Sequence, residues 1–233
     1  MPRQPRLRGP RPDRGVFEID RDPAEDVMNK INSGSMFSRI RRGEFCLVWA
    51  GIPCASWSRA RCGHPPPLRG ENVPEIWGLP DLSDKDNERV RMGNRQVRWL
   101  ARIVSACIKS NTPVIVENPA SSRLWKAPPF LNLLRKCSSR IFHHCMFGSP
   151  HMKPTRLMFQ HISLDGVIRR CSGPRGICAR TGLPHEVLRG TDSKGIFKTA
   201  RASAYPFEFC FDLAALTIPQ FSNPTHSPPP PGH

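Results

Sequence analysis

Two continuous runs of apolar residues predict buried strands. Residues 45–50 read Phe-Cys-Leu-Val-Trp-Ala and stop at Gly51, and residues 113–117 read Pro-Val-Ile-Val-Glu and lead into Asn118. Runs of this length without polar alternation are typical of strands that are covered on both faces. Shorter patterns predict three further strands, at residues 16–20, 141–146 and 156–161.

Helical periodicity is clearest over residues 88–110. One stripe of this segment is apolar and another is basic, namely Val90, Val97, Leu100, Val104 and Ile108 against Arg91, Arg95, Arg98 and Arg102. The pattern predicts an amphipathic helix with a basic face. Two more helices are expected at residues 24–35 and 130–136, and residues 207–216 fit either a helix or a strand. The alternation of strands and helices predicts an α/β fold, with a mostly parallel sheet and covering helices.

The chain divides into one domain between two tails. Residues 1–15 are rich in proline and arginine and residues 221–233 are rich in proline, so we expect both to be disordered. The length between them, residues 16–220, suits a single core. Within it, residues 56–86 are dense in glycine and proline, and a loop of this length in a compact domain usually serves a function.

The chain is strongly basic. Lysine and arginine total 35 against 19 acidic residues, which gives a formal charge of +16 and a pI near 10.3. This balance favours a polyanionic partner, and we expect nucleic acid, with DNA preferred over RNA. The predicted contacts are Arg59, Arg61 and the helical arginines Arg91, Arg95, Arg98 and Arg102. Alternatively, the charge acts mainly through the arginines of the first fifteen residues.

Signals for a membrane or for secretion are not visible in the sequence. No stretch approaches the roughly 18 apolar residues of a membrane span, and the first residues lack the apolar segment of a signal peptide. We expect a soluble, intracellular monomer without a membrane partner, and a nuclear location is compatible with the charge. The nine cysteines are odd in number and scattered, so we interpret them as reduced thiols.

Cys54 follows the first of the two buried strands, and Glu117 is the last residue of the second. Because the carboxyl ends of parallel strands meet at one edge of a sheet, we expect the two side chains to lie together where α/β proteins bind ligands. Backbone amides and nearby arginines can lower the pKa of a thiol such as Cys54, which makes it a candidate nucleophile. Taken singly, the two residues also fit plainer roles, as an inert thiol and a strand-end acid.

The surroundings of these two residues resemble those in cytosine-C5 methyltransferases. Residues 51–58, Gly-Ile-Pro-Cys-Ala-Ser-Trp-Ser, resemble the nucleophile loop of that family, and residues 114–119, Val-Ile-Val-Glu-Asn-Pro, resemble the strand carrying its glutamate-asparagine pair. Weaker likenesses link residues 146–156 to the family's Gly-x-Pro-Gln-x-Arg-x-Arg segment and residues 17–20, Phe-Glu-Ile-Asp, to its second cofactor motif. Glu-Asn-Pro-Ala-Ser-Ser-Arg-Leu-Trp and a late Ala-Tyr-Pro also look like a methyltransferase-like group of some protist and virus-associated genomes.

The resemblance implies a class I methyltransferase (Rossmann-like) fold, S-adenosyl-L-methionine as cofactor and cytosine in nucleic acid as substrate. The Cys54 thiolate would add to C6 of a flipped cytosine while Glu117 bonds N3. Arg156, or Lys153 as a second choice, would hold the base or the covalent intermediate. The implied cofactor contacts are Glu18, Ile19, Asp26 and Pro53.

The chain departs from the family pattern in several places. Ala55 replaces the usual glutamine after Pro-Cys, and Pro119 replaces the usual valine after Glu-Asn. No Phe-x-Gly-x-Gly loop precedes Val16, so we expect the first strand-loop-helix unit to be lacking, as in a truncated gene product, and cofactor binding to be negligible. The alternative function is a non-catalytic nucleic-acid-binding protein that retains a degenerate methyltransferase fold.

A second group of potential ligands is Cys171, Cys178 and His185, with six residues between successive members. Zinc binds cysteine and histidine, but this spacing is not the compact two-residue knuckle, and a fourth ligand requires the approach of Cys145 or His144. We therefore predict no bound metal and keep a zinc-stabilised interaction module as a weaker alternative.

Overall fold

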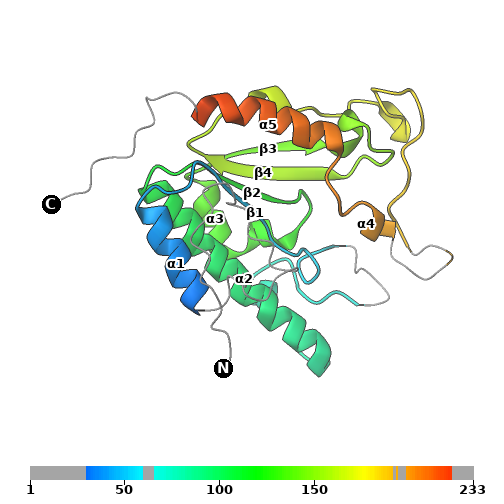
Figure 1. Cartoon of the computed structure of the whole chain (residues 1–233). Coiled ribbons are helices and arrows are strands. Elements are labelled where there is room, and N and C mark those ends of the chain that lie inside the picture. Colours follow the sequence, from blue (N-terminus) through cyan, green and yellow to red (C-terminus); the bar gives the residue numbers. More distant parts are fainter. Residues whose placement is uncertain (1–29, 60–65, 191–192, 194–197, 222–233) are drawn as a thin grey trace, which may run out of the picture.

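The computed structural model describes residues 30–59, 66–190, 193 and 198–221 (Figure 1). Its helices and strands are α1 (Lys30–Arg41), β1 (Val48–Gly51), α2 (Asp84–Lys109), β2 (Val114–Pro119), α3 (Pro128–Leu134), β3 (Ser138–His143), β4 (Pro154–Gln160), α4 (Lys198–Arg201) and α5 (Phe207–Phe221). Outside the described residues lie the predicted tail 1–15, the predicted strand 16–20, the first part of the predicted helix 24–35 and residues 222–233 of the second tail.

The four described strands form one mixed sheet in the order β1-β2-β4-β3. β1 and β2 are parallel, whereas β4 is antiparallel to both of its neighbours, β2 and β3. The prediction of a mostly parallel sheet is wrong for these pairings, although the α/β class is confirmed. The reason is that only residues 144–153 connect β3 to β4, and a parallel return needs a crossover of a dozen or more residues.

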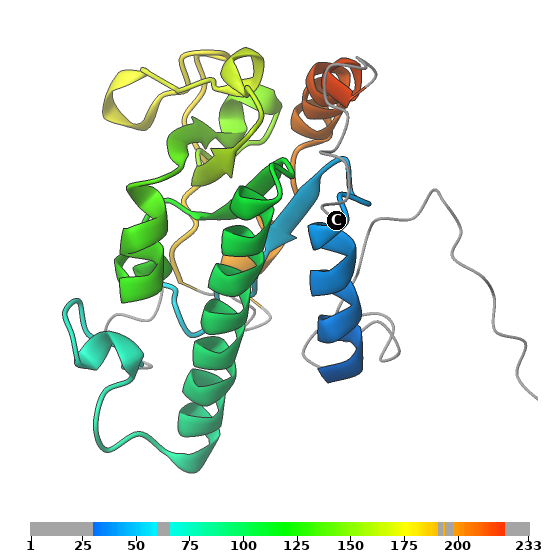
Figure 2. The same cartoon turned by 90° about the vertical axis from the view of Figure 1, so that its left-hand side faces the viewer.

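Helices cover both faces of the sheet, with α1, α2 and α3 on one side and α5 on the other (Figures 1 and 2). Val114 and Val116 of β2 enter the core beneath the first three helices, together with Met158 of β4. Ile115 enters the second core, where it packs with Phe209 of α5. Alternate residues of β2 therefore serve different cores, as the pleat of a strand requires. Residues 207–216 belong to the helix α5, which decides between the two predicted alternatives.

α2 is the predicted amphipathic helix, and it begins four residues earlier than expected. The Ser83 side chain accepts a hydrogen bond from the Asp86 N–H at 3.3 Å and caps this polar first turn. The predicted apolar stripe is buried except for Ile108, which is half-buried. Even this helix is too polar to cross a membrane, and no other helix in the described part of the chain is both long and apolar enough to do so.

β1 is shorter and less buried than its apolar run predicts. The strand begins at Val48 rather than at residue 45, and its first three residues are half-buried. Among the described strands only β2 pairs with β1, so β1 is an edge strand there and is not covered as a central strand would be.

Candidate active site

The parallel pairing of β1 with β2 brings the Cys54 loop and Glu117 to the same edge of the sheet. Gly51, the last residue of β1, lies opposite Glu117 in the register, and Cys54 follows three residues later. Glu117 is buried and the Cys54 side chain is half-buried. The expected meeting of these two segments at one sheet edge is therefore present in the structure.

Asn118 fixes the beginning of the Cys54 loop. Its Nδ2 donates a hydrogen bond to the backbone oxygen of Ile52 at 3.0 Å, and both groups are buried. A buried bond across the two segments holds the chain immediately before Pro53 and Cys54, because breaking it would leave polar groups unsatisfied. Asn118 thus holds the Cys54 loop, while its neighbour Glu117 belongs to the candidate site.

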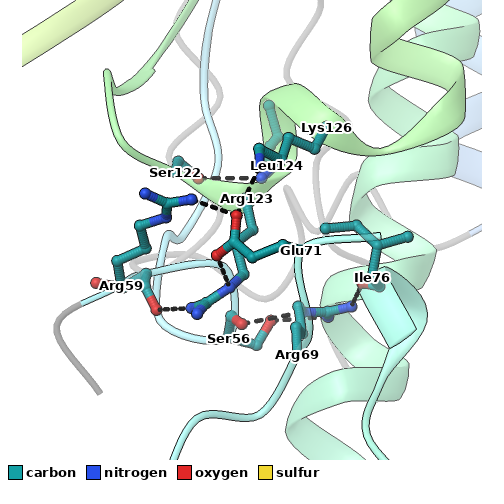
Figure 3. Close-up of polar contacts among 10 residues, drawn as sticks. Ser56, Arg59, Arg69, Glu71, Ile76, Ser122, Arg123, Leu124 and Lys126 are labelled. Carbon is teal, nitrogen blue, oxygen red and sulfur yellow. Dashed lines mark hydrogen bonds and ion pairs between the residues drawn. The ribbon is translucent and has the colours of Figure 1, made fainter. Parts of the chain in front are cut away.

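The second half of the Cys54 loop is held by a buried arginine, Arg69, which sequence reasoning did not identify (Figure 3). All of its guanidinium nitrogens donate, to the Ser56 backbone oxygen and Oγ, the Ile76 oxygen, Asn94 Oδ1 and the Val90 oxygen, at 2.7–3.1 Å. The guanidinium also lies 3.5 Å from the centroid of the Trp57 ring. Burial, reinforced by Arg123, lowers the pKa of Arg69 to about 9, so it remains charged at neutral pH.

A second cross-link joins the loop to the segment after Glu117 (Figure 3). Arg123 donates its backbone N–H to the Trp57 oxygen at 2.9 Å and its Nη1 to the Ser58 oxygen at 3.1 Å. Its Nε pairs with Glu71 at 3.0 Å. Glu71 also pairs with Arg59 and Lys126, and these cations hold the pKa of its carboxyl at about 2. Arg59, a predicted nucleic-acid contact, is thus partly engaged inside the protein.

Tyr205 completes the environment of Glu117. Its hydroxyl donates to Glu117 Oε2 at 2.8 Å, and its ring packs edge-on against Trp49 at 5.7 Å. A side chain at Gly51 would approach the same hydroxyl to 3.1 Å, so glycine leaves room for this contact. Burial raises the pKa of Glu117, while Tyr205 and Lys153 act in the opposite direction. Tyr205 is the single tyrosine of the chain, and it lies in the Ala-Tyr-Pro segment that carries part of the family resemblance.

Lys153 is a cation that lowers the pKa of both Cys54 and Glu117. Its Nζ donates to the Ala202 backbone oxygen at 2.6 Å. Burial lowers the pKa of Lys153, and the charges of Glu117 and Cys54 counter that shift. The pKa of the Cys54 thiol is raised by burial and by Glu117, and Lys153 lowers it in part. Cys54, Glu117 and Lys153 therefore interact electrostatically within one partly buried site.

A buried histidine, His144, lies close to Tyr205, with 6.4 Å between the ring centroids. His144 is fully buried, and its Nε2 lies 3.1 Å from the hydroxyl of Thr155. Burial lowers the pKa of His144 to about 3, with further contributions from Lys153 and His151, so the ring is neutral. Its Nδ1 is buried without a hydrogen-bond partner among the described residues.

Arg156 lies on the opposite face of the sheet from Glu117. It pairs with Asn118 across β2 and β4, and residues directly opposite one another in an antiparallel pair point to the same face. Its guanidinium lies 5.4 Å from the centroid of the Trp125 ring, and its Nε is buried without a partner among the described residues. Of the two basic residues predicted to hold the base, Lys153 is therefore the one beside Glu117 and Cys54.

Pro53 is the one predicted cofactor contact that the structure describes. It is exposed and, with Ala55 and Ser56, borders an open groove of about 520 Å³ whose other wall is the first half of α2. Glu18, Ile19 and Asp26 lie outside the described residues.

The four predicted arginines of α2 are exposed and share one face of the helix. Two of them also lie over aromatic rings, Arg98 at 4.9 Å from the centroid of Trp77 and Arg102 at 5.0 Å from that of Phe37. Arg91 pairs with Glu88 at 3.8 Å, and Arg95 is exposed between them. Arg61 lies outside the described residues.

Comparison with known proteins gives no relative: no family model, curated protein or solved structure matches the chain.

Proposed function

We propose that the protein is a cytosine-C5 methyltransferase of nucleic acid, with DNA preferred over RNA and S-adenosyl-L-methionine as the methyl donor. The observation that supports this best is the junction of the Cys54 loop with β2, in which Asn118 holds Ile52 and the register places Gly51 beside Glu117. We also infer a class I methyltransferase-like fold. In support, β1, β2 and β3 run in one direction, and only β4, which lies between β2 and β3, is reversed.

Glu117 is suited to act on the cytosine ring as an acid. Burial raises the pKa of its carboxyl and so favours the protonated form, which can donate a hydrogen bond to N3. Such a bond withdraws electrons from the ring and makes C6 more electrophilic. Tyr205 orients this carboxyl, because its hydroxyl donates a hydrogen bond to Oε2 of Glu117.

Cys54 becomes a nucleophile when the base is bound. Burial and, after it, negative charge on Glu117 raise the pKa of the thiol, whereas Lys153 lowers it. Sharing the Glu117 proton with N3 keeps the carboxyl from repelling the thiolate, so base binding and thiol activation are coupled.

In the covalent step the thiol proton leaves to solvent, sulfur bonds to C6, and the C5–C6 π pair moves to C5. When bound, the cofactor would supply the methyl group: the electron pair on C5 would form the new C–CH3 bond, and the S–CH3 bond would break with its pair left on the departing thioether sulfur. Loss of the C5 proton to solvent then returns an electron pair to the ring, the sulfur–C6 bond breaks, and the Cys54 thiolate is restored. Pro53, exposed beside the groove, is the described residue that would line the cofactor.

The test uses exchange of the C5 hydrogen, because reversible addition of the thiolate makes C5 basic without any methyl donor. Release of tritium from C5-tritiated cytosine is measured in DNA and in RNA. We expect the release to vanish in Cys54→Ser and to fall by about 100-fold in Glu117→Gln. Cys46→Ser, which removes an exposed thiol outside the site, should leave it unchanged.

The exchange separates the two candidate functions. A folded protein that binds DNA yet releases no tritium would favour the non-catalytic nucleic-acid-binding alternative. Because the reaction needs no cofactor, it tests the loops independently of the expectation that cofactor binding is negligible. Labelled methyl transfer is then measured as a separate assay.

The basic face of α2 is proposed to contact the phosphates. If it does, DNA affinity falls steeply with salt, and each of Arg91, Arg95, Arg98 and Arg102 that is replaced by alanine lowers the salt slope by about one. Arg140, exposed on β3, is the matched control. An unchanged slope after all four replacements would assign binding to another part of the chain.

A further inference from the structure

Three cysteines and one histidine converge at a place separate from the Cys54 loop. The ligand atoms of Cys145, Cys171, Cys178 and His185 all lie within 4.8 Å of one another. Cys145 and Cys178 are buried, and the other two are half-buried. Cys145 comes from the short turn His144–Phe147 after β3, and the other three come from the long segment between β4 and α4. Of the two candidates for a fourth ligand, the structure brings in Cys145, while His144 faces Thr155.

The arrangement matches the ligand set of a structural zinc ion. With zinc–sulfur bonds of about 2.3 Å and tetrahedral angles, neighbouring ligand atoms lie about 3.5–3.8 Å apart. Cys171 Sγ and His185 Nε2 are 3.6 Å apart. Four protein ligands leave no open position for a substrate, which is the mark of a structural rather than a catalytic site.

The local backbone is folded so as to present these ligands. Residues 177 and 184 form an antiparallel bridge, the Cys178 N–H donates to the Leu183 oxygen at 2.8 Å, and the His185 N–H donates to the Gly176 oxygen at 2.8 Å. Gly182, with a φ of 70°, closes the turn in the left-handed region that favours glycine. This hairpin brings Cys178 and His185 to one end although six residues separate them.

Backbone amides also face the sulfurs. The Ala179 N–H donates to Cys171 Sγ at 3.3 Å, and the backbone N–H groups of Arg180 and Thr181 donate to Cys178. Such donors surround the thiolates of metal sites, where they offset negative charge and orient the ligand. The cluster therefore has an outer shell as well as four ligands.

Although the spacing in the sequence predicted no bound metal, we infer from this convergence that Cys145, Cys171, Cys178 and His185 bind one zinc ion that fastens the segment 171–185 to the connection between β3 and β4. The neighbouring bonds support this role, because the Glu186 N–H donates to the Pro150 oxygen at 2.9 Å and Arg180 pairs with Glu208 of α5 at 2.9 Å. The same connection ends at Lys153, so the ion supports one wall of the candidate active site without entering it. The inference does not depend on the proposed function.

The metal content of the full chain, purified under reducing conditions, tests the inference. We expect about one zinc per chain by mass spectrometry, and a cobalt-substituted protein should show thiolate-to-cobalt charge transfer and the visible absorption of a tetrahedral ion. Removal of the metal by a chelator should lower the melting temperature by about 10 °C or more.

Variants distinguish ligands from bystanders. Cys178→Ser should reduce bound zinc at least about tenfold, whereas Cys46→Ser and Cys210→Ser, which remove exposed thiols, should retain it. His185→Cys preserves a four-ligand set, so it should keep the zinc and strengthen the charge-transfer band of the cobalt form. This variant tests the site even if Cys178→Ser fails to fold.

Three results would overturn the inference. One is a folded protein that contains no stoichiometric zinc while all of its cluster thiols are free. Another is a disulfide between two of the three cluster cysteines in protein kept under reductant. The third is equal zinc content in Cys178→Ser, His185→Ala and the unchanged chain.

Discussion

The Cys54 loop and the four-ligand cluster both contain cysteine, but their surroundings differ. Cys54 faces an acid and a lysine, and its loop is fixed by side chains that bind backbone oxygens. Cys171 and Cys178 face Cys145, His185 and backbone amides. The first arrangement holds one thiol in place for reaction, and the second gathers thiols for mutual coordination. The neighbours, rather than the residue type, decide what a cysteine can do.

The two regions also differ in what stabilises them. The Cys54 loop depends on polar contacts from Arg69, Asn118 and Arg123, which need correct packing but no ion. The four-ligand cluster instead brings three thiols and one imidazole close together, and a bound metal ion would hold them there. A change that damages one region should therefore leave the other intact, and each of the following predictions examines that independence.

The largest effect is expected for Arg69→Ala. The change leaves the acceptors on Ser56, Ile76 and Val90 without their donor and opens a cavity beside Trp57, so we expect unfolding to become easier by about 3–4 kcal/mol. Denaturation by urea measures this loss. Cys54 should also react faster with a thiol reagent, because its loop is released.

The control for this change is Arg95→Ala on the exposed face of α2, which should alter stability by less than about 0.5 kcal/mol. Zinc content should be the same in both variants. Loss of zinc in Arg69→Ala would show that the two regions fold as one unit.

An intermediate effect is expected for Gly93→Ala in α2. The added Cβ would lie 2.3 Å from Ser56 Oγ and 2.9 Å from Arg69 Nη2, so one of these groups must move. We expect a net destabilisation of about 1–3 kcal/mol, despite the better helix propensity of alanine. Gly34→Ala in α1, where no atom lies within 4 Å of the added Cβ, should instead stabilise by about 0.5–1 kcal/mol. Thermal melting compares them, and equal signs would contradict this account.

The smallest effect is expected for Tyr205→Phe, at about 1 kcal/mol, because one hydrogen bond is lost. Burial raises the pKa of Glu117 above its ordinary 4.5 in the folded state, so the folded state binds the proton more tightly. Stability should therefore fall as the pH rises from 4.5 through the folded pKa. The Tyr205 bond lowers that pKa, so Tyr205→Phe should extend the fall to higher pH.

Urea denaturation across this pH range measures the dependence. Glu117→Gln cannot ionise and is the matched control, so this pH-dependent component should disappear in it. A fall of the same size in Glu117→Gln would assign the dependence to another group, and the contact with Tyr205 would then carry no such role.

Much of the secondary structure could be predicted from local pattern. The stripe of α2 follows from residues three and four apart, and the buried strand β2 follows from an uninterrupted apolar run. The direction of β4 was not predictable from its own residues, because it depends on how far the chain travels after β3. The half-buried state of β1 likewise depends on which strands lie beside it.

The candidate site was predictable where its residues adjoin a strand end. Cys54 and Glu117 could be paired because parallel strands carry their following loops to one edge. Tyr205 lies 88 residues from Glu117 along the chain and reaches it only through the position of the segment before α5. Arg69 belongs to a segment that was predicted to be a loop. Its burial depends on the packing of that loop against α2, where it binds the Val90 oxygen, and the local sequence does not show this.

By itself, the sequence determined the α/β class, the basic face of α2 and the meeting of the Cys54 loop with the strand that carries Glu117. These features depend on the spacing of residues within one segment or on where a strand ends, and both can be read from a short stretch of sequence. The tertiary structure decided that Lys153, rather than Arg156 on the other face of the sheet, interacts with Cys54 and Glu117, and that Cys145 joins Cys171, Cys178 and His185. Such meetings depend on strand pairing and on which face of the sheet each side chain occupies, and the residues involved are far apart along the chain.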